Sequence, residues 1–294
     1  MYESAYTALQ NGQRTWIKAN FHTHAGICAL GHCGILPLGD VIEAYKEAGF
    51  KALAITNHDR HISVEKEYEG ICVIDGVEYS ADPHMLLIGV RDFFDLPRRE
   101  AIDSTAAAGG FTILCHPNWQ YKGYFPDELL DSLDGYAGIE IANAVVNRLS
   151  GSGLALDAWD YILSRGKRKW GFGNDDFHLF HDAGRVYNMI YAKSGSFEDI
   201  KEAVTEGCFY VSSGVALKEF SLEGDELFVK AGYFRETYIN SFEYKLTGAG
   251  GRVLCKSEGE TLRCKLSGEA YARLEVTSEC GAKMYLQPVF KIEN

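Results

Sequence analysis

All nine histidines of this 294-residue chain lie between His22 and His181. Six of them stand beside or just after short apolar runs that are typical of β-strands: His22, His24, His58, His84, His116 and His178. Neutral imidazole is the commonest metal ligand in proteins, and carboxylates complete such shells. Any single one of these histidines is more often a hydrogen-bonded core or rim residue. Their joint position at strand ends instead indicates one metal centre.

Two pairs of candidate ligands have the spacing of an extended segment. His22 and His24 are two residues apart in NFHTH, and Asp176 and His178 are two apart in GNDDFHLF. Side chains alternate along such a segment, so the two members of each pair share a face and can bind the same ion. Asp175 then points away, and we interpret it as a turn residue or as a support for the ligands.

The other candidate ligands also stand at the ends of apolar runs. His58 follows KALAIT, Glu78 closes ICVIDGVEYS, His84 opens the next run, and His116 follows FTILC. In β/α barrels, catalytic groups collect at the C-terminal ends of the strands. The pattern therefore predicts that these side chains meet at one end of a sheet.

The elements that position these residues fall into two parts. Along residues 15–213, apolar β-branched runs alternate with amphipathic helical stretches, which predicts an α/β fold with a parallel sheet closed into a barrel. From about residue 215 onward, short alternating strands are separated by Gly-rich or charged turns, which predicts a small antiparallel β-sandwich. We therefore expect a catalytic domain over residues 1–214 and an accessory β-domain over residues 215–294.

Composition narrows the classes of function. The formal net charge of −12 argues against a nucleic-acid groove, because binding a phosphate backbone needs clustered Lys and Arg. The first 21 residues lack the pattern of a positively charged stretch followed by an apolar one, and no run of about 18 apolar residues occurs, so we expect neither export nor membrane insertion. Its eight cysteines are scattered without a CxxC pair. This pattern predicts a reduced, cytoplasmic protein.

The order of the motifs resembles the PHP (polymerase and histidinol phosphatase) family. The matching runs are HTH at 22–24, ITNHD at 55–59, GVEYS with Glu78, then His84, CHP with His116 and DFH at 176–178. With the β-rich segment that follows, the chain resembles the CehA/McbA-type members. The resemblance implies a distorted, TIM-like (β/α)7 barrel with two or three divalent ions, Zn, Mn or Fe, at its C-terminal mouth. It also implies hydrolysis of phosphoesters.

The resemblance further implies a distribution of ligands over the ions. His22, His24, Glu78 and Asp176 would hold the first ion, and Glu78 would bridge to a second ion held by His84 and His116. His58 and His178 would hold a third ion with one more ligand from the loop after His24.

That loop is where the chain departs from the family. Cys33 occupies the position of the usual Asp, and the adjacent His32 is the ligand that we favour. Asn57 stands where the family commonly has Asp.

These residues predict a metal-dependent phosphoesterase. Its substrate would be a small phosphomonoester or phosphodiester attacked by a metal-bound hydroxide. The catalytic set would be Glu78, Asp176 and His178, with Arg185 as a contact for the substrate phosphate. The same chemistry also suits a carbamate, ester or amide, and a binding module with a vestigial barrel is a further alternative.

Residues near the motifs have weaker functional interpretations. His61 and His181 are either general acids or ordinary exposed histidines. Glu140 and Asn143 either line the pocket or form a buried hydrogen-bonded pair. Trp119, Tyr121 and Tyr124 either wall an aromatic leaving group or pack at the rim. The natural substrate and the oligomeric state are not predicted by the sequence.

Overall fold

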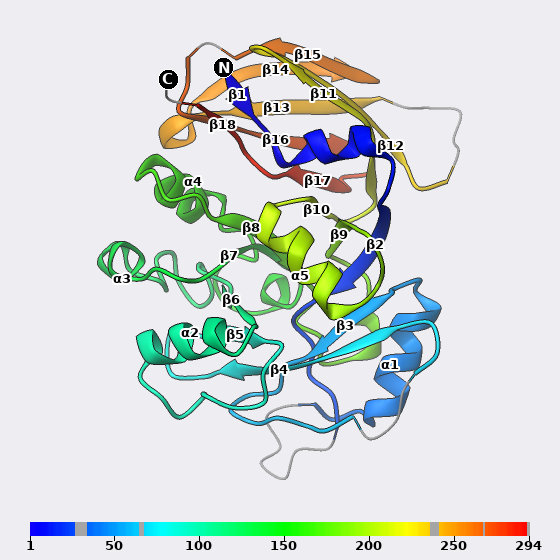
Figure 1. The fold of residues 1–294 in the computed structure, drawn as a ribbon, viewed down its shortest axis with the longest axis vertical. Coiled ribbons are helices and arrows are strands. Elements are labelled where there is room, and N and C mark those ends of the chain that lie inside the picture. The colour runs from blue at the N-terminus through cyan, green and yellow to red at the C-terminus, as the bar shows by residue number, and fades with distance from the viewer. Residues whose placement is uncertain (27–33, 65–67, 236–240, 267, 293–294) are drawn as a thin grey trace.

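The computed structural model describes residues 1–26, 34–64, 68–235, 241–266 and 268–292, which form a mixed α/β structure (Figure 1). Nine strands belong to the segment predicted as catalytic: β2 (Thr15–Asn20), β3 (Ala52–Ile55), β4 (Cys72–Tyr79), β5 (Met85–Ile88), β6 (Phe111–Leu114), β7 (Gly138–Asn143), β8 (Trp170–Asn174), β9 (Tyr187–Ala192) and β10 (Phe209–Ser212). Its helices are α1 (Leu38–Glu47), α2 (Arg98–Ala107), α3 (Asp127–Ser132), α4 (Leu156–Ser164) and α5 (Phe197–Glu206). None of the described helices is long and apolar enough to cross a membrane.

The strands of this part form one continuous ladder, in the order β10-β9-β2-β3-β4-β5-β6-β7-β8. The pairs within β2-β3-β4 and within β6-β7-β8 are parallel, as the β/α alternation predicts. Strand β5 is antiparallel to both of its neighbours, and β9 is antiparallel to β2. The five residues between β4 and β5 allow a hairpin return, whereas a parallel crossover needs a dozen or more. The sheet is therefore mixed.

Closure into the predicted barrel is not confirmed, because within the described ranges β8 pairs with β7 alone, and β9 already has β2 and β10 on its two edges. Just beyond the strands, an isolated parallel bridge between Thr23 and Phe177 links the ends of β2 and β8. The side chain of Asn188 on β9 spans the seam between β8 and β9. Its Nδ2 donates to the carbonyl of Gly173 at 2.8 Å, and its Oδ1 accepts from the amide of Gly173 at 3.1 Å. A Cβ on Gly173 would lie 2.2 Å from Cγ1 of Val211, so the close approach of β10 to β8 requires glycine here.

The strands beyond residue 214 extend this ladder and add a second sheet. Strands β11 (Val215–Glu223), β12 (Glu226–Tyr233) and β15 (Thr261–Lys265) form a separate antiparallel sheet. The remaining strands join the long ladder, where β17 pairs with β10: β13 (Phe242–Thr247), β14 (Val253–Gly259), β16 (Tyr271–Ser278), β17 (Lys283–Leu286) and β18 (Val289–Lys291).

The N-terminal strand also belongs to this upper part of the molecule. Strand β1 (Tyr2–Glu3) pairs with β18, so the N-terminus lies among the C-terminal strands (Figure 1). The sheet thus continues from the first part of the chain into the second. The domain boundary at residue 214 stays a prediction.

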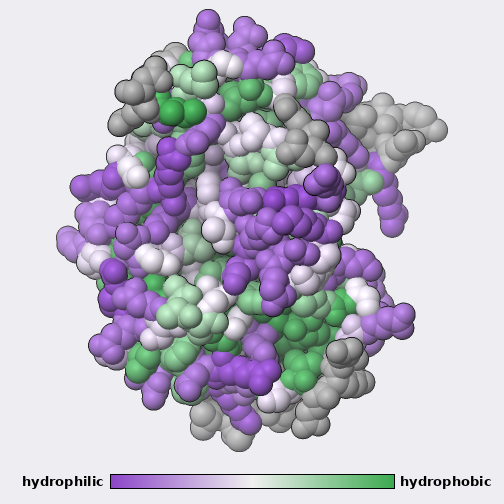
Figure 2. Space-filling model, viewed as in Figure 1, coloured by the Kyte–Doolittle hydropathy of each residue, from purple (hydrophilic) through white to green (hydrophobic). Residues whose placement is uncertain are grey.

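Helix α5 shows how the helices cover the sheet. Ser196 caps its N-terminus by accepting from the amide of Asp199, and Gly207 ends it in the left-handed conformation that favours glycine. Ile200, Ala203 and Val204 of the helix are buried in one cluster with strand residues. Hydrophilic side chains cover the middle of the molecular face that carries this helix (Figure 2).

A buried ion pair joins helix α4 to strand β16. Nε and Nη2 of Arg273 donate to the two carboxylate oxygens of Asp160 at 2.7 and 2.6 Å, and the hydroxyl of Tyr271 donates to the same carboxylate at 3.1 Å. Asp160 and Arg273 are 6% and 4% exposed, so neither charge is solvated if its partner is lost. The pair therefore fixes the C-terminal strands against the α/β part.

We expect Asp160→Ala to lower the free energy of unfolding by about 3 to 5 kcal/mol, because it leaves a buried guanidinium without its counter-charge. Urea denaturation measures this change. Asp103→Ala, which removes an exposed carboxylate paired with Arg99, is the matched control and should change the free energy by less than about 1 kcal/mol. Equal stability of the two variants would contradict the role of the buried pair.

Candidate metal centre

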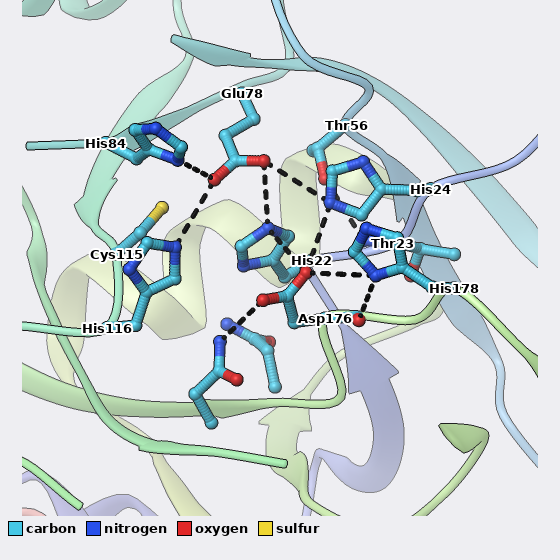
Figure 3. A network of polar contacts seen from close by, with 12 residues as sticks. His22, Thr23, His24, Thr56, Glu78, His84, Cys115, His116, Asp176 and His178 are labelled. Carbon is cyan, nitrogen blue, oxygen red and sulfur yellow. Dashed lines mark hydrogen bonds and ion pairs between the residues drawn. The ribbon is translucent and has the colours of Figure 1, made fainter. Parts of the chain in front are cut away.

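The carboxylate of Glu78 lies at the centre of a buried histidine cluster (Figure 3). Its Oε1 is 2.8 Å from Nδ1 of His84 and 3.4 Å from Nε2 of His116. Its Oε2 faces three other imidazoles at 2.9 to 3.3 Å, those of His58, His22 and His24. The two oxygens of one carboxylate thus face two separate groups of potential ligands.

The second carboxylate of the cluster belongs to Asp176, just past β8. Its Oδ1 lies 3.3 Å from Nε2 of His22, 3.2 Å from Nε2 of His24 and 3.6 Å from Nδ1 of His178. Of the cluster side chains, His58 and His178 are the most exposed, at 29% and 30%, whereas His22 and His24 are fully enclosed. The cluster is therefore open to solvent on the side of His58 and His178.

The chain brings these side chains together through strand ends. His22 and His24 follow β2, His58 follows β3, Glu78 lies near the end of β4, His116 follows β6, and Asp176 follows β8. An isolated bridge between His58 and Glu78 continues the parallel pairing of β3 and β4, and a second parallel bridge between Thr23 and Phe177 joins the segments that follow β2 and β8. The ends of the parallel strands thus hold the cluster in the manner predicted for the C-terminal edge of an α/β sheet.

Glu140 on β7 contacts two of the candidate ligands, His22 and His116. Its Oε1 lies 2.9 Å from Nδ1 of His22, and its Oε2 accepts from the backbone amide of His116 at 2.9 Å. Asn143 donates from Nδ2 to Glu140 at 3.0 Å and to Asp176 at 3.2 Å. A carboxylate bound to the far nitrogen of an imidazole fixes the ring and raises the basicity of the nitrogen that faces an ion. Both residues are therefore positioning residues for the ligands.

The charges in the cluster shift its pKa values in opposite directions. Burial raises the pKa of Glu78, but the charges of His58 and His22 outweigh burial and hold it well below the ordinary value. Burial lowers the pKa of His22, but the carboxylates of Asp176, Glu140 and Glu78 raise it well above the ordinary value. For His24, burial and the nearby His178 lower the pKa to about 3. The neutral imidazole of His24 is the form that binds metal ions.

The backbone is strained at two of the cluster residues. His116 has φ of 30° and Asp176 has φ of 54°, both in the region that side-chain-bearing residues rarely adopt. Such positions cost about 1 to 3 kcal/mol each and gather at functional sites. The left-handed backbone conformation directs each of these side chains toward the cluster at the point where its strand ends.

The donor set fits divalent ions. Nε2 of His22 and Oε2 of Glu78 are buried and, in the described part of the chain, make no hydrogen bond, although they lie 3.2 Å apart. Four overlapping groups have ligand atoms within 4.8 Å of one another: His22, Glu78, Cys115 and His116; His24, His58 and His178; His22, His24 and Asp176; and His58, Glu78 and His84. Imidazole and carboxylate donors of this kind suit Zn, Mn and Fe.

Cys115 is the member of these groups that the sequence analysis missed. Alternation along β6 places it opposite to His116, but the left-handed turn at His116 brings both side chains to the same side (Figure 3). Burial raises the pKa of its thiol well above the ordinary value. The unusual pairing of a cysteine with a histidine at a strand end was the signal available in the sequence.

The other candidate residues lie around the cluster or outside it. His32 and Cys33 lie outside the described residues, so the third ligand of the His58 and His178 pair stays a prediction. Asn57 binds both backbone groups of Ala25, its Oδ1 accepting at 3.0 Å and its Nδ2 donating at 2.7 Å. It therefore fixes the chain just after His24.

The two remaining histidines do not join the cluster. Nε2 of His61 lies 2.7 Å from Asp75, and His181 is 60% exposed beside Asp182. Arg185 is exposed and lines a neighbouring cavity, so its role as a phosphate contact stays a prediction. Asp175 points away from the cluster as alternation predicts, since its carboxylate accepts from the amides of residues 184, 185 and 186.

The rings of the 119–124 segment pack on one side of the cluster. The ring of Trp119 lies 5.2 Å from His84 and 5.0 Å from His116, measured between centroids. The hydroxyl of Tyr124 donates to Asp82 at 2.5 Å, while Tyr121 is 57% exposed. These contacts agree with rim packing, and an interaction with an aromatic leaving group stays a prediction.

Comparison with known proteins gives a structural likeness only. No family model matches the chain, and no curated protein matches it by sequence. A similar solved structure is a two-domain protein from Bacteroides vulgatus ATCC 8482 described as containing a predicted PHP-like metal-dependent phosphoesterase. The TM-score is 0.52 at 18% identity, over 90% of this chain and 91% of that one. The two proteins share a fold over nearly their whole lengths.

We expect Glu140→Gln to weaken metal binding about 10- to 100-fold, because the substitution removes the carboxylate that orients His22. Competition with a chromogenic chelator measures the dissociation constant directly and needs no substrate. Glu43→Gln, at an exposed carboxylate on α1, is the matched control and should leave the constant unchanged. If both variants hold metal as tightly as the parent protein, Glu140 does not position the ligands.

Proposed function

We propose that the protein is a metal-dependent phosphoesterase that hydrolyses a small phosphomonoester or phosphodiester. The observation that carries this proposal is the bridging position of Glu78, whose two oxygens face separate groups of imidazoles at 2.8 to 3.4 Å. Bound divalent ions would supply an activated water and would neutralise the charge that develops on the phosphoryl group.

The protein side chains have distinct roles in this proposal. Glu78 bridges the two groups of ligands, His22, His24 and Asp176 complete one group, and His84 and His116 complete the other. The cluster buries the carboxylates of Glu78, Asp176 and Glu140, which would repel a phosphate dianion, so substrate binding requires the positive charge of the ions. His58 and His178 lie on the exposed side, where a substrate would enter, and in this proposal His178 contacts it.

The finer assignments rest on the motifs together with the structural likeness. We propose that the chain is a PHP-type enzyme of the CehA/McbA kind, whose α/β part is a distorted barrel opened at the seam between β8 and β9. Two or three ions of Zn, Mn or Fe would occupy the cluster, with His32 completing the site of His58 and His178. Residues 1–214 would act as the catalytic domain and residues 215–294 as an accessory domain, in a cytoplasmic protein.

The proposed activity predicts a clear response to metal removal. Chelator-treated protein should lose hydrolysis of nitrophenyl phosphate or of a nitrophenyl phosphodiester, and Mn or Zn should restore it. A nitrophenyl carboxylic ester in the same panel tests the alternative metallohydrolase. Turnover of the ester alone would favour acyl chemistry, and metal-loaded protein inert toward every substrate would favour a binding module. Unchanged phosphate turnover in the metal-free protein would refute the metal-dependent mechanism.

A pair of histidine variants separates the cluster from its surroundings. We expect His178→Ala to lower kcat/KM by about 100-fold or more, because it removes a side chain at the exposed side of the cluster. His181→Ala is the matched control three residues away, with a largely exposed side chain, and should stay within about twofold of the parent. Steady-state kinetics measure both. A large loss in His181→Ala alone would instead assign the general acid to His181.

A further inference from the structure

A cavity of about 290 Å³ lies beside the seam between β8 and β9. Residues at the end of β7 and after it, residues just before β9, and residues from β10 and β17 contribute to its lining. The cavity thus draws on both parts of the chain. Its volume is near the lower limit of about 300 Å³ for small-molecule pockets.

The walls of this cavity are largely apolar. Val211 and Tyr285 are 0% and 3% exposed, and Leu154 and Val186 complete this surface. The hydroxyl of Tyr285 is buried and has no hydrogen-bond partner in the part of the chain that the structure describes. Because this hydroxyl is enclosed, Tyr285 contributes the exposed part of its ring to the wall of the cavity.

The charges around the cavity are positive, although the protein has a net charge of −12. The guanidinium of Arg185 is exposed and makes no hydrogen bond or ion pair with the described residues. Nζ of Lys283 is engaged with Glu275 at 2.6 Å and with Thr277 at 2.9 Å. Among the described residues that line the cavity, none carries a carboxylate. The cavity therefore favours an anion, with Arg185 as its free cation.

The cavity is separate from the metal cluster. None of the residues in the four potential ligand groups lines it. The two places share only Asn143, whose Nδ2 is already engaged with Glu140 and Asp176 on the cluster side. A molecule in the cavity would thus lie next to Asn143, which is hydrogen-bonded to Asp176, without contacting the candidate ligands.

We propose that this cavity is a second ligand site that binds a small organic anion. The carboxylate or phosphate of the ligand pairs with the guanidinium of Arg185, whose planar fork matches both groups. Its apolar body packs against Val211 and the ring of Tyr285. The site does not depend on the proposed phosphoesterase activity, since the metal cluster supplies none of its groups.

Titration calorimetry with benzoate and with acetate tests the site, on protein as purified and after removal of metal ions by a chelator. The stripped protein prevents the probes from binding to ions. We expect benzoate to bind both preparations, and acetate to bind at least about tenfold more weakly because it lacks an apolar body. Phenyl phosphate in the same titration shows whether the site prefers a phosphate or a carboxylate, and preferential binding of either supports the proposal.

Arg185→Gln should weaken the binding of benzoate about tenfold, since it removes the charged partner. Arg99→Gln, at an exposed arginine on α2, is the matched control and should bind benzoate as the parent does. Crystals soaked in benzoate should place its carboxylate at Arg185. The proposal is overturned if neither benzoate nor phenyl phosphate binds, if Arg185→Gln binds both as tightly as the parent, or if the soaked probe lies only at the cluster.

Discussion

The buried carboxylate of Glu78 is the interaction on which the rest of the site depends. Five imidazoles lie within 3.4 Å of its two oxygens. Its negative charge helps to raise the pKa values of His22 and His58 against the effect of burial, in a region with little solvent. Asp176 and Glu140 continue the same alternation of sign around His22. Burying these charged groups costs free energy. The binding of cations by the cluster would offset this cost.

The open seam explains how the sheet can carry both the cluster and the C-terminal strands. Strand β9 already pairs with β2 and β10, so β8 meets it without a backbone ladder. The side-chain amide of Asn188 forms hydrogen bonds to both backbone groups of Gly173 in place of strand pairing. Its Nδ2 also donates to Oδ1 of Asn174 at 3.1 Å. Oδ1 of Asn174 in turn accepts from the amide of Phe21 at 2.9 Å, just before His22. The side chain that bridges the seam is therefore hydrogen-bonded to Asn174, the residue that holds the backbone just before the first candidate ligand.

The sequence predicts the cluster better than it predicts the topology. Two-residue spacing predicted Asp176 and His178 on one side and Asp175 on the other, and the side chains lie so, although the left-handed backbone at Asp176 departs from the extended conformation that the prediction assumed. The unpaired seam between β8 and β9 could not be predicted, because hydrophobic periodicity indicates which faces are buried and not which strands pair. Strand β5 shows the same limit, since its apolar run MLLI suits either direction. Cys115 was missed for a local reason, the left-handed turn at His116.

The neighbours Asp175 and Asp176 show why residue type alone does not define a role. The carboxylate of Asp175 accepts from three backbone amides and from the hydroxyl of Tyr45, yet burial raises its pKa to about 7. Burial also acts on Asp176, but the histidines around it outweigh burial and lower its pKa. The difference is one of partners, neutral donors for Asp175 and imidazoles for Asp176. The left-handed backbone at Asp176 lies between the two environments, with one carboxylate directed to the loop and the other to the candidate metal centre.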